Sequence, residues 1–266
     1  MLLWGFLISL TLTNCHTGTS KLSRGPRMVF FKGDSIVVPE SVIYTPDFAG
    51  VVLRGRVISV TPKLAESKSL QRIVIEDSSL TKIPNSIYNL ERLEYLSIET
   101  KRVSFDSSKT AYWKNLQLSL ALGKLKNLQV LSLPSNLIKQ LPPTIGQLKK
   151  LKKLNLIGNE LERLPSEFSQ LESLIELDLN YNHFKTFPEV LLTLPRIKKL
   201  SISVYHNNIK ADSIRQLYAQ RQGGRHVNVL IGNDSRKEQD EFEKSFGKMH
   251  KEVKNLNDSI KRAKKK

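Results

Sequence analysis

The chain has 266 residues, of which 39% are hydrophobic and 25% charged. This balance is typical of a folded globular domain and argues against a membrane-embedded or wholly disordered chain. The formal net charge is +17, which predicts attraction to polyanions such as nucleic acid, anionic lipid or acidic polysaccharide, or else a lysine-rich solvated surface.

The first element in the chain is an uncharged, apolar leader. Residues 1–14 carry no charged side chain, and the run 2–12 has the length of a signal-peptide core. The run leads into the tetrapeptide LTNC, which ends at Cys15 and resembles the lipobox of bacterial lipoproteins. The resemblance implies that residues 1–14 are a signal peptide and that Cys15 is the lipidation site. Asn14 and the lack of an early basic residue depart from the pattern, so cleaved secretion and a packed segment stay open.

A polar stretch follows the cysteine. Residues 15–35 are rich in serine, threonine, glycine and lysine, a composition typical of a tether. We therefore expect a lipid-anchored tether over 15–35, a repeat domain with caps over 36–232, and a separate C-terminal segment. The predicted location is the bacterial cell envelope, anchored to the membrane through Cys15, or secreted if Cys15 is not lipidated.

The centre of the chain repeats every 23 residues. Leucine or isoleucine recurs at this spacing at Leu70 and Leu93, and again at Leu128, Leu151, Leu174 and Ile197. Three consecutive units carry LxxLxLxxN followed by an apolar residue, proline and an apolar pair at helical spacing. The alternating half predicts a short strand, which proline ends, and the second half predicts a helical return. Stacked units would bury their leucines together and pair the strands in a parallel sheet.

This pattern resembles the leucine-rich-repeat family, in the LPxxIxxL variety common in bacteria, over roughly residues 50–210. The resemblance implies an α/β fold: a horseshoe-shaped leucine-rich-repeat solenoid with a parallel concave sheet. Inward-facing asparagines at the strand exits are expected to satisfy backbone groups of the turns. They are Asn136, Asn159 and Asn182.

Two units depart from the asparagine pattern. Ser78 replaces the asparagine in the Leu70 unit. In the last unit Tyr205 stands at the expected position, with Asn207 and the next residue arriving late. The sequence therefore predicts a slipping register and a closing cap over 205–232.

Ligands of this family usually dock on the concave sheet, so its outward strand positions are the candidate site. The candidates are Tyr95, Lys153, Asn155, Ile157, Asp178, Asn180, Tyr181 and Lys199. A solvated sheet face remains the alternative. A basic strip is expected along the strand-entry edge, formed by Lys124, Lys126, Lys149, Lys150, Lys152, Lys153, Arg196, Lys198 and Lys199. Because acidic residues interrupt it, both a polyanion site and a solvated edge fit this strip.

An insertion interrupts the repeats between Leu93 and Leu128, which are 35 residues apart instead of 23. The surplus lies near 104–115 and contains Phe105, Tyr112 and Trp113. Tyr112 and Trp113 are further ligand-binding candidates because functional residues often sit on loops held by rigid scaffolds. The same aromatics could instead cover the edge of their own repeat.

The C-terminal segment, 233–266, predicts an amphipathic helix with a basic tail. A capping box begins at Ser235, and apolar residues then follow at alternating spacings of four and three. This seam comprises Phe242, Phe246, Met249, Val253, Leu256 and Ile260. A seam of this kind is typical of a coiled coil, so residues 242–260 could form an oligomer, dock on the solenoid, or bind a partner helix.

Nothing in the sequence predicts catalysis. It contains neither a phosphate-binding glycine loop nor a nucleophile elbow, and its five histidines are scattered. With one cysteine, internal disulfides and cysteine-based zinc clusters are excluded. We therefore expect a non-enzymatic protein without metal, cofactor or small-molecule substrate. The predicted partner is a protein, with a polyanion as the alternative, and the membrane is contacted through lipid on Cys15.

Overall fold

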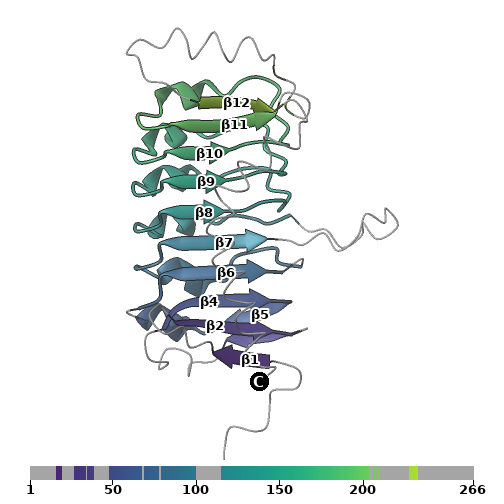
Figure 1. Ribbon diagram of the computed structural model, residues 1–266, viewed down its shortest axis with the longest axis vertical. Helices are drawn as coiled ribbons and strands as arrows, with labels where there is room; N and C mark the ends of the chain where they lie inside the picture. Colours follow the sequence, from purple (N-terminus) through teal and green to yellow (C-terminus); the bar gives the residue numbers. More distant parts are fainter. Residues whose placement is uncertain are drawn as a thin grey trace, which may run out of the picture.

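The computed structural model describes residues 16–19, 27–33, 35–38, 48–67, 69–77, 79–99, 115–203, 207, 209 and 228–232. Within these ranges ten strands form one sheet in the order β1-β2-β4-β6-β7-β8-β9-β10-β11-β12 (Figure 1). The strands are β1 (His16–Thr19), β2 (Arg27–Lys32), β4 (Phe48–Arg54), β6 (Arg72–Glu76), β7 (Tyr95–Glu99), β8 (Val130–Ser132), β9 (Lys153–Asn155), β10 (Glu176–Asp178), β11 (Lys199–Ser203) and β12 (Asn228–Gly232). Strand β1 is antiparallel to β2, and the other neighbouring pairs are parallel.

The 23-residue period sets the register of the sheet. Leu131, Leu154, Leu177 and Leu200 lie side by side on β8 to β11. Each strand therefore repeats the orientation of its neighbour, and the predicted solenoid with a parallel sheet is confirmed. A smaller parallel pair, β3 (Ile36–Val38) and β5 (Val57–Val60), lies beside the N-terminal coils.

The helical returns are short 3-10 helices. They are η2 (Pro62–Glu66), η3 (Asn85–Asn89), η5 (Leu120–Lys124), η6 (Pro143–Gln147), η7 (Ser166–Gln170) and η8 (Glu189–Thr193). In η6, for example, the Ile145 N–H donates to the Pro142 carbonyl at 2.9 Å, an i to i+3 bond. Each return has only five helical residues. A 3-10 helix suits so short a segment because it rises further per residue than an α-helix.

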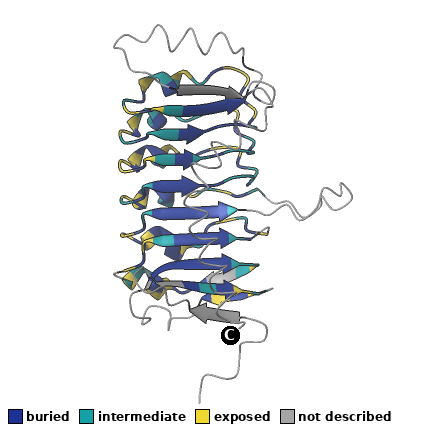
Figure 2. Cartoon of the chain, in the orientation of Figure 1, coloured by how far each residue is buried: buried dark blue, intermediate teal, exposed yellow. Residues whose placement is uncertain are grey.

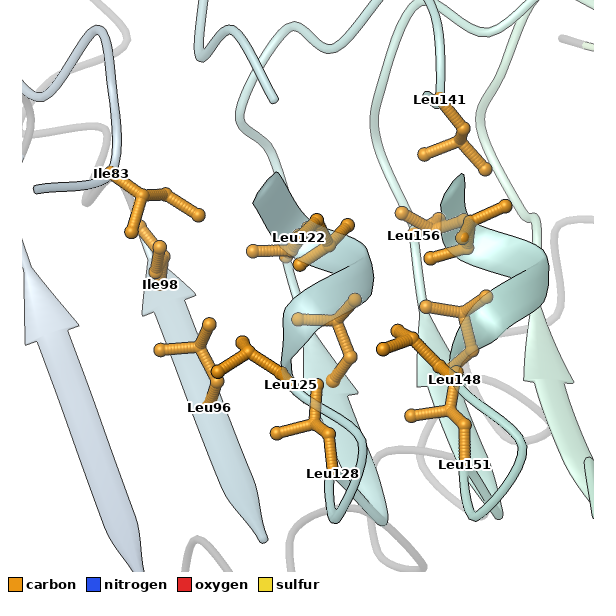
Figure 3. Packing of buried hydrophobic residues seen from close by; sticks show 14 of the residues in the cluster. Ile83, Leu96, Ile98, Leu122, Leu125, Leu128, Leu141, Leu148, Leu151 and Leu156 are labelled. Atoms are coloured by element: carbon orange, nitrogen blue, oxygen red, sulfur yellow. The ribbon is translucent and has the colours of Figure 1, made fainter. Parts of the chain in front are cut away.

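The core lies between the sheet and the 3-10 helices. Figure 3 shows Leu96 and Ile98 of β7 facing Leu122 and Leu125 of the next coil, and all four are fully buried. Each coil thus shares its apolar side chains with the coils before and after it. Burying one leucine contributes about 1.5–3 kcal/mol, so stability comes from stacking several coils.

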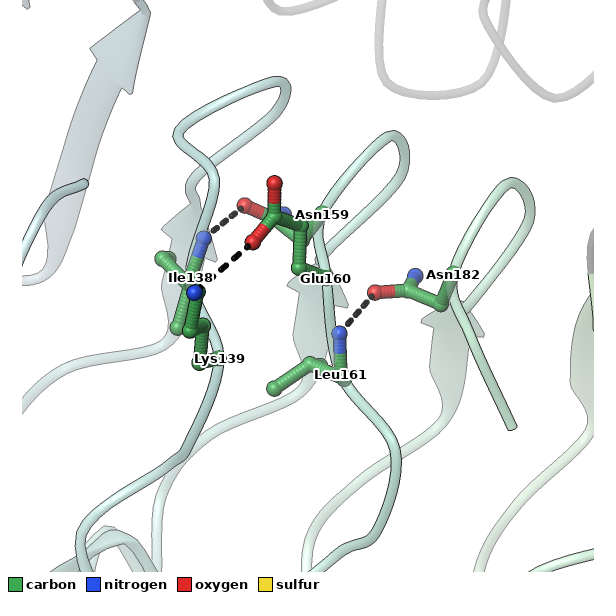
Figure 4. Close-up of polar contacts among 6 residues, drawn as sticks. All are labelled: Ile138, Lys139, Asn159, Glu160, Leu161 and Asn182. Carbon is green, nitrogen blue, oxygen red and sulfur yellow. Dashed lines mark hydrogen bonds and ion pairs between the residues drawn. The ribbon is translucent and has the colours of Figure 1, made fainter. Parts of the chain in front are cut away.

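The asparagines join neighbouring coils rather than only their own turns. Asn159 Oδ1 accepts a hydrogen bond from the Ile138 N–H in the preceding coil at 3.1 Å (Figure 4). The Asn136 N–H of the same coil donates to it at the same distance, 3.1 Å. Asn159 Nδ2 donates to the carbonyls of Leu133 and Leu156, one in each coil. The predicted structural role is therefore confirmed.

Asn207 continues this ladder, contrary to the expected slip of register. It is fully buried, its Oδ1 accepts from the Phe184 N–H at 3.1 Å, and its Nδ2 donates to the Leu179 carbonyl at 3.1 Å. Two additional residues separate it from Asn182, relative to the 23-residue repeat. The turn accommodates these two residues, so that the amide still reaches the same backbone groups as in the other coils. Strand β12 then extends the sheet within the predicted cap.

In the Leu70 unit the role passes to Asp77, one residue before the expected position. Asp77 is 3% exposed. One carboxylate oxygen accepts from the Val57 N–H at 2.8 Å, and the other accepts from the Ser79 N–H and hydroxyl, both at 2.7 Å. Ser78 itself lies outside the described residues. A carboxylate fits here because all three described partners are donors.

The N-terminal boundary of the fold is earlier than predicted. The tether expected over 15–35 contains β1 and β2, both of which are part of the main sheet. Val29 and Phe31 of β2 are buried in the core. Residues 15–35 are polar on average, so their composition does not reveal the apolar residues of β2. These residues are buried where β2 pairs with β4.

Several predicted features lie outside the described residues. They are the signal peptide over 1–14, Cys15, the aromatics Phe105, Tyr112 and Trp113, and the C-terminal helix and tail over 233–266. Among the described residues, no helix has both the length and the apolar character needed to cross a membrane.

Candidate binding face

The outward side of the main sheet, opposite the 3-10 helices, is the candidate site and is called the open face. Two rows of side chains run along it from strand to strand. The first row contains Arg72, Tyr95, Val130, Lys153, Glu176 and Lys199, and the middle row contains Phe30, Val52, Val74, Ser97, Ser132, Asn155, Asp178 and Ser201. From β6 onward these rows are the ones the 23-residue register predicts, because strand side chains alternate between faces. Phe30 and Val52 join the middle row through the pairing of β2 and β4 with β6.

The N-terminal half of the open face is apolar. Val52, Val74, Tyr95 and Val130 form one buried cluster with Phe30 packed against it, and these five residues are called the apolar row. Their exposures are 0%, 1%, 7% and 7% for Val52, Val74, Tyr95 and Val130. In Figure 2 the strands of this region are mostly dark blue. The outward positions of this half are therefore buried, and neither an exposed contact surface nor a solvated sheet face describes them.

The C-terminal half carries charges of alternating sign. Lys153, Glu176 and Lys199 lie next to one another on β9, β10 and β11, and they are called the charged row. Lys153 Nζ lies 2.9 Å from Glu176 Oε1, with side-chain exposures of 25% and 18%. These partly exposed charges lie on rigid strands and are held in a fixed order.

Two candidates of the middle row have a structural task. Asn155 Oδ1 accepts from the Ile157 N–H at 3.0 Å, and Asp178 Oδ1 accepts from the Asn180 N–H at 2.9 Å. Asp178 is only 2% exposed, whereas Asn155 is half-buried. Both side chains therefore fix the bend that ends their strand, as short polar side chains often do.

Tyr181 owes its position to a left-handed turn. Its φ is 54°, and the equivalent residues of the two preceding coils, Ser135 and Gly158, have φ of 56° and 69°. The Tyr181 N–H donates to the Ser203 hydroxyl at 2.9 Å. Ile157 and Tyr181 are half-buried, and Asn180 is 8% exposed. The turn thus places Ile157 and Tyr181 at the exit edge of the charged row.

The chemistry of the open face changes around Tyr95. Burial raises the pKa of its phenol, while a hydrogen bond to Ser97 and the nearby Arg72 lower it and Glu99 raises it. Because the net shift is upward, the phenol stays neutral to a higher pH than an ordinary tyrosine, and the ring packs with the apolar side chains of the cluster. Tyr95 therefore belongs with the apolar row rather than with the exposed contacts predicted from sequence.

The basic strip forms bonds between coils. Lys126 and Lys152 donate to the side-chain oxygens of Gln147 and Gln129 at 2.8 and 2.9 Å. Lys149 lies 3.3 Å from Glu172. These contacts are exposed and hence individually weak, but they direct the amines along the coil edges. The geometry favours a solvated edge over a continuous phosphate track.

The structure therefore brings six of the predicted residues together. Lys153, Asn155, Ile157, Asp178, Asn180 and Lys199 lie on three adjacent coils, with Tyr181 at their exit edge and Tyr95 two strands away from β9. Tyr112, Trp113 and Cys15 lie outside the described residues. Sequence reasoning missed the apolar row, although the runs 51–53 and 73–75 are apolar at every position, a pattern typical of strands buried on both faces.

The described residues contain no group of three or more histidine, cysteine, aspartate or glutamate side chains arranged to hold a metal ion. What the open face offers is a rigid surface with an apolar half and a charged half.

Comparison with known proteins identifies the family. A family model described as leucine-rich repeat region matches residues 106–265. A solved leucine-rich-repeat protein of Leptospira interrogans is 30% identical, with a TM-score of 0.53; the match covers 68% of this chain but only 43% of that one. No curated protein sequence shows a significant match.

Internalin C2 of Listeria monocytogenes has the same general fold, with a TM-score of 0.52. It is 16% identical, and the match covers 76% of this chain and 80% of that one. The repeat register, the stacked coils and the matched family model all indicate a leucine-rich-repeat solenoid. The chain belongs to the leucine-rich-repeat family.

Proposed function

We propose that the protein is a non-enzymatic cell-envelope lipoprotein that binds a protein partner through the charged half of its open face. The observation that carries this proposal is the charged row, Lys153–Glu176–Lys199, held in register on three adjacent strands. Half-buried Asn155, Ile157 and Tyr181 border it.

Such a surface suits a protein partner better than a uniform polyanion. A partner with charges in the opposite order would pair with all three residues, whereas a phosphate or sulfate chain would be repelled by Glu176. Ordered charges of this kind select partners and fix their register. Ile157 and Tyr181 supply the apolar contact area in which binding energy usually concentrates.

The test is a pair of charge-matched variants. Lys153→Ala/Lys199→Ala removes two positive charges from the charged row, and Lys124→Ala/Lys150→Ala removes two from exposed positions elsewhere. Each protein is used to capture partners from envelope extracts, and the captured protein is then purified and its Kd measured. We expect the first variant to weaken binding at least tenfold and the second to retain it. Equal binding by the two variants would refute the assignment of the site.

The formal net charge of +17 favours a second candidate function, the binding of an acidic polysaccharide or another polyanion. Salt separates the two because polyanion binding weakens steeply as ionic strength rises. Heparin serves as the probe. If it binds at low salt and is lost steadily as salt increases, and if both lysine variants weaken it equally, the polyanion function is supported over the protein-binding one.

The proposed anchor is tested separately. Cys15→Ala should move the protein from the membrane fraction to the soluble fraction of cells that express the full chain, because the thiol that receives the lipid is gone. Cys15→Ser serves as a second variant with the same expectation. Retention of both variants in the membrane fraction would refute a lipid anchor at this residue, without bearing on the binding face.

A further inference from the structure

The apolar row is buried although its side chains point away from the core. On β6 the core side chains are Ile73 and Ile75, so Val74 between them faces the open side of the sheet. Val74 is nevertheless 1% exposed and Val52 0%. An outward valine on a bare sheet would keep much of its surface in contact with water.

Neighbours within the row do not account for this burial. Side chains on adjacent strands lie about 5 Å apart and cover the flanks of a valine but not its tip. Among the described residues, only sheet residues belong to this cluster. The tips of these valines therefore need a cover that the apolar row itself does not supply.

We propose that the amphipathic segment 242–260 lies across the open face and packs its apolar seam on the apolar row. The seam has six apolar side chains, from Phe242 to Ile260, at alternating spacings of four and three. A helix with this spacing presents one continuous apolar stripe. Like the row on the sheet, this stripe needs an apolar surface to cover it.

The dimensions agree. As a helix, the seam from Phe242 to Ile260 would be about 27 Å long at 1.5 Å per residue. The apolar row crosses five adjacent strands, β2, β4, β6, β7 and β8, and spans about 19 Å at roughly 4.8 Å per strand.

The segment also starts close enough to reach the row. Strand β12 ends at Gly232, and nine residues separate it from Phe242. Extended, they cover up to about 30 Å. The four strand spacings from β12 to β8 amount to about 19 Å, so the chain can reach the near end of the apolar row with slack.

Two other occupants fit less well. The aromatics of the insertion, Phe105, Tyr112 and Trp113, follow no regular spacing and would not form a stripe as long as the row. A second copy of the chain could supply the same seam, but the resulting cover would depend on protein concentration. The proposed contact does not depend on the proposed function, although a partner that needs the apolar row would have to displace the segment.

The experiment measures how well the apolar row is covered, through the reactivity of a single cysteine placed in it. Val74→Cys is introduced into the full chain with Cys15→Ser, and the rate of its reaction with a maleimide is measured under native conditions. Val52→Cys provides a second position if the first variant does not fold. The seam variant is Phe246→Gln/Val253→Gln. Its matched control is Lys244→Gln/Lys251→Gln, which places the same residues on the opposite side of the helix.

We expect the seam variant to react at least tenfold faster than the parent while the control reacts as slowly as the parent. Equal rates in seam variant and parent would overturn the proposal. Faster reaction caused instead by Tyr112→Ala/Trp113→Ala would assign the cover to the insertion. Protection that disappears on dilution, together with a dimer in light scattering, would assign it to a second copy.

Discussion

The side-chain oxygen of Asn182 lies 3.1 Å from the backbone nitrogen of Leu161, one coil earlier in the solenoid. The same side chain donates to the carbonyls of Leu156 and Leu179, one in each coil, at 2.9 and 3.1 Å. Asn182 is fully buried. One amide therefore satisfies backbone groups of two coils at once, which couples the stacking of the coils to the turn at each strand exit.

Replacing this amide should destabilise the protein strongly. Asn182→Ala leaves the buried Leu161 N–H without its partner, which costs about 1–3 kcal/mol. It also removes one of the two side-chain bonds accepted by the carbonyls of Leu156 and Leu179, which keep Asn159 and Asn207 as donors. We expect the free energy of unfolding to fall by roughly 2 kcal/mol or more, measured by urea denaturation. Asn127→Ala, at a half-buried side chain whose bonds to the Glu91 carbonyl and the Lys150 amine are at the surface, should cost less than about 1 kcal/mol. Similar losses for both would contradict the special role of the ladder.

The shared core makes a second prediction. Leu154 is fully buried among the side chains of its neighbours, with 0% exposure, whereas Leu120 is 66% exposed. Leu154→Ala should lower the free energy of unfolding by about 2–5 kcal/mol because it removes apolar contacts and leaves a cavity. Leu120→Ala, the control, should change it by less than about 0.5 kcal/mol. Thermal and urea unfolding of both variants measure this contrast, and tolerance of Leu154→Ala would argue against a common core.

The helical side of the stack is packed closely enough to require glycine. A Cβ at Gly146 would collide with the backbone oxygen of Glu167 in the next coil. Gly146→Ala should therefore push η6 away from η7 and cost about 1–3 kcal/mol, seen as a lower Tm. Ser169 occupies the equivalent position one coil later, and Ser169→Ala should leave Tm nearly unchanged. An unchanged Tm for Gly146→Ala would mean that the coils can separate freely.

Alkaline pH should weaken the apolar half of the open face. Burial raises the pKa of Tyr95 above its ordinary value of 10.0, so the folded protein holds this proton more tightly than the unfolded chain does. The resulting stability is complete below pH 10 and is lost as pH rises from there towards the folded-state pKa. Tyr95→Phe should reduce the loss of stability above pH 10, followed by urea unfolding at increasing pH. An identical pH dependence in parent and variant would exclude Tyr95 as its source.

Some of the face was foreseeable and some was not. The period of 23 placed Lys153, Glu176 and Lys199 side by side, and the structure confirms this register. Exposure was not foreseeable in the same way. Val74 and Asp178 were expected at outward positions and occupy them, but both are buried, because burial depends on what lies above the sheet and on local bends as well as on which way a strand side chain points.

The ends of the solenoid show the same limit. A repeat predicts where the next coil belongs only while its spacing holds. Spacing alone therefore predicts that Asn207 falls out of register, and composition alone predicts that the residues of β2 belong to a tether. In the structure Asn207 joins the ladder and β2 pairs with β4. Both outcomes depend on partners that sequence spacing does not reveal: a buried backbone N–H in one case and an open sheet edge in the other.

By itself, the sequence determined the repeating coil, its length, its inward leucines and the parallel register. Identical units that share a core bury their leucines only when equivalent residues of neighbouring coils lie side by side. The tertiary structure decided which outward residues are exposed, which polar side chains bond between coils, and where the sheet begins. Those properties arise from contacts between segments far apart in the chain, such as Asn182 with Leu156 or Asp77 with Val57, and no local pattern encodes them.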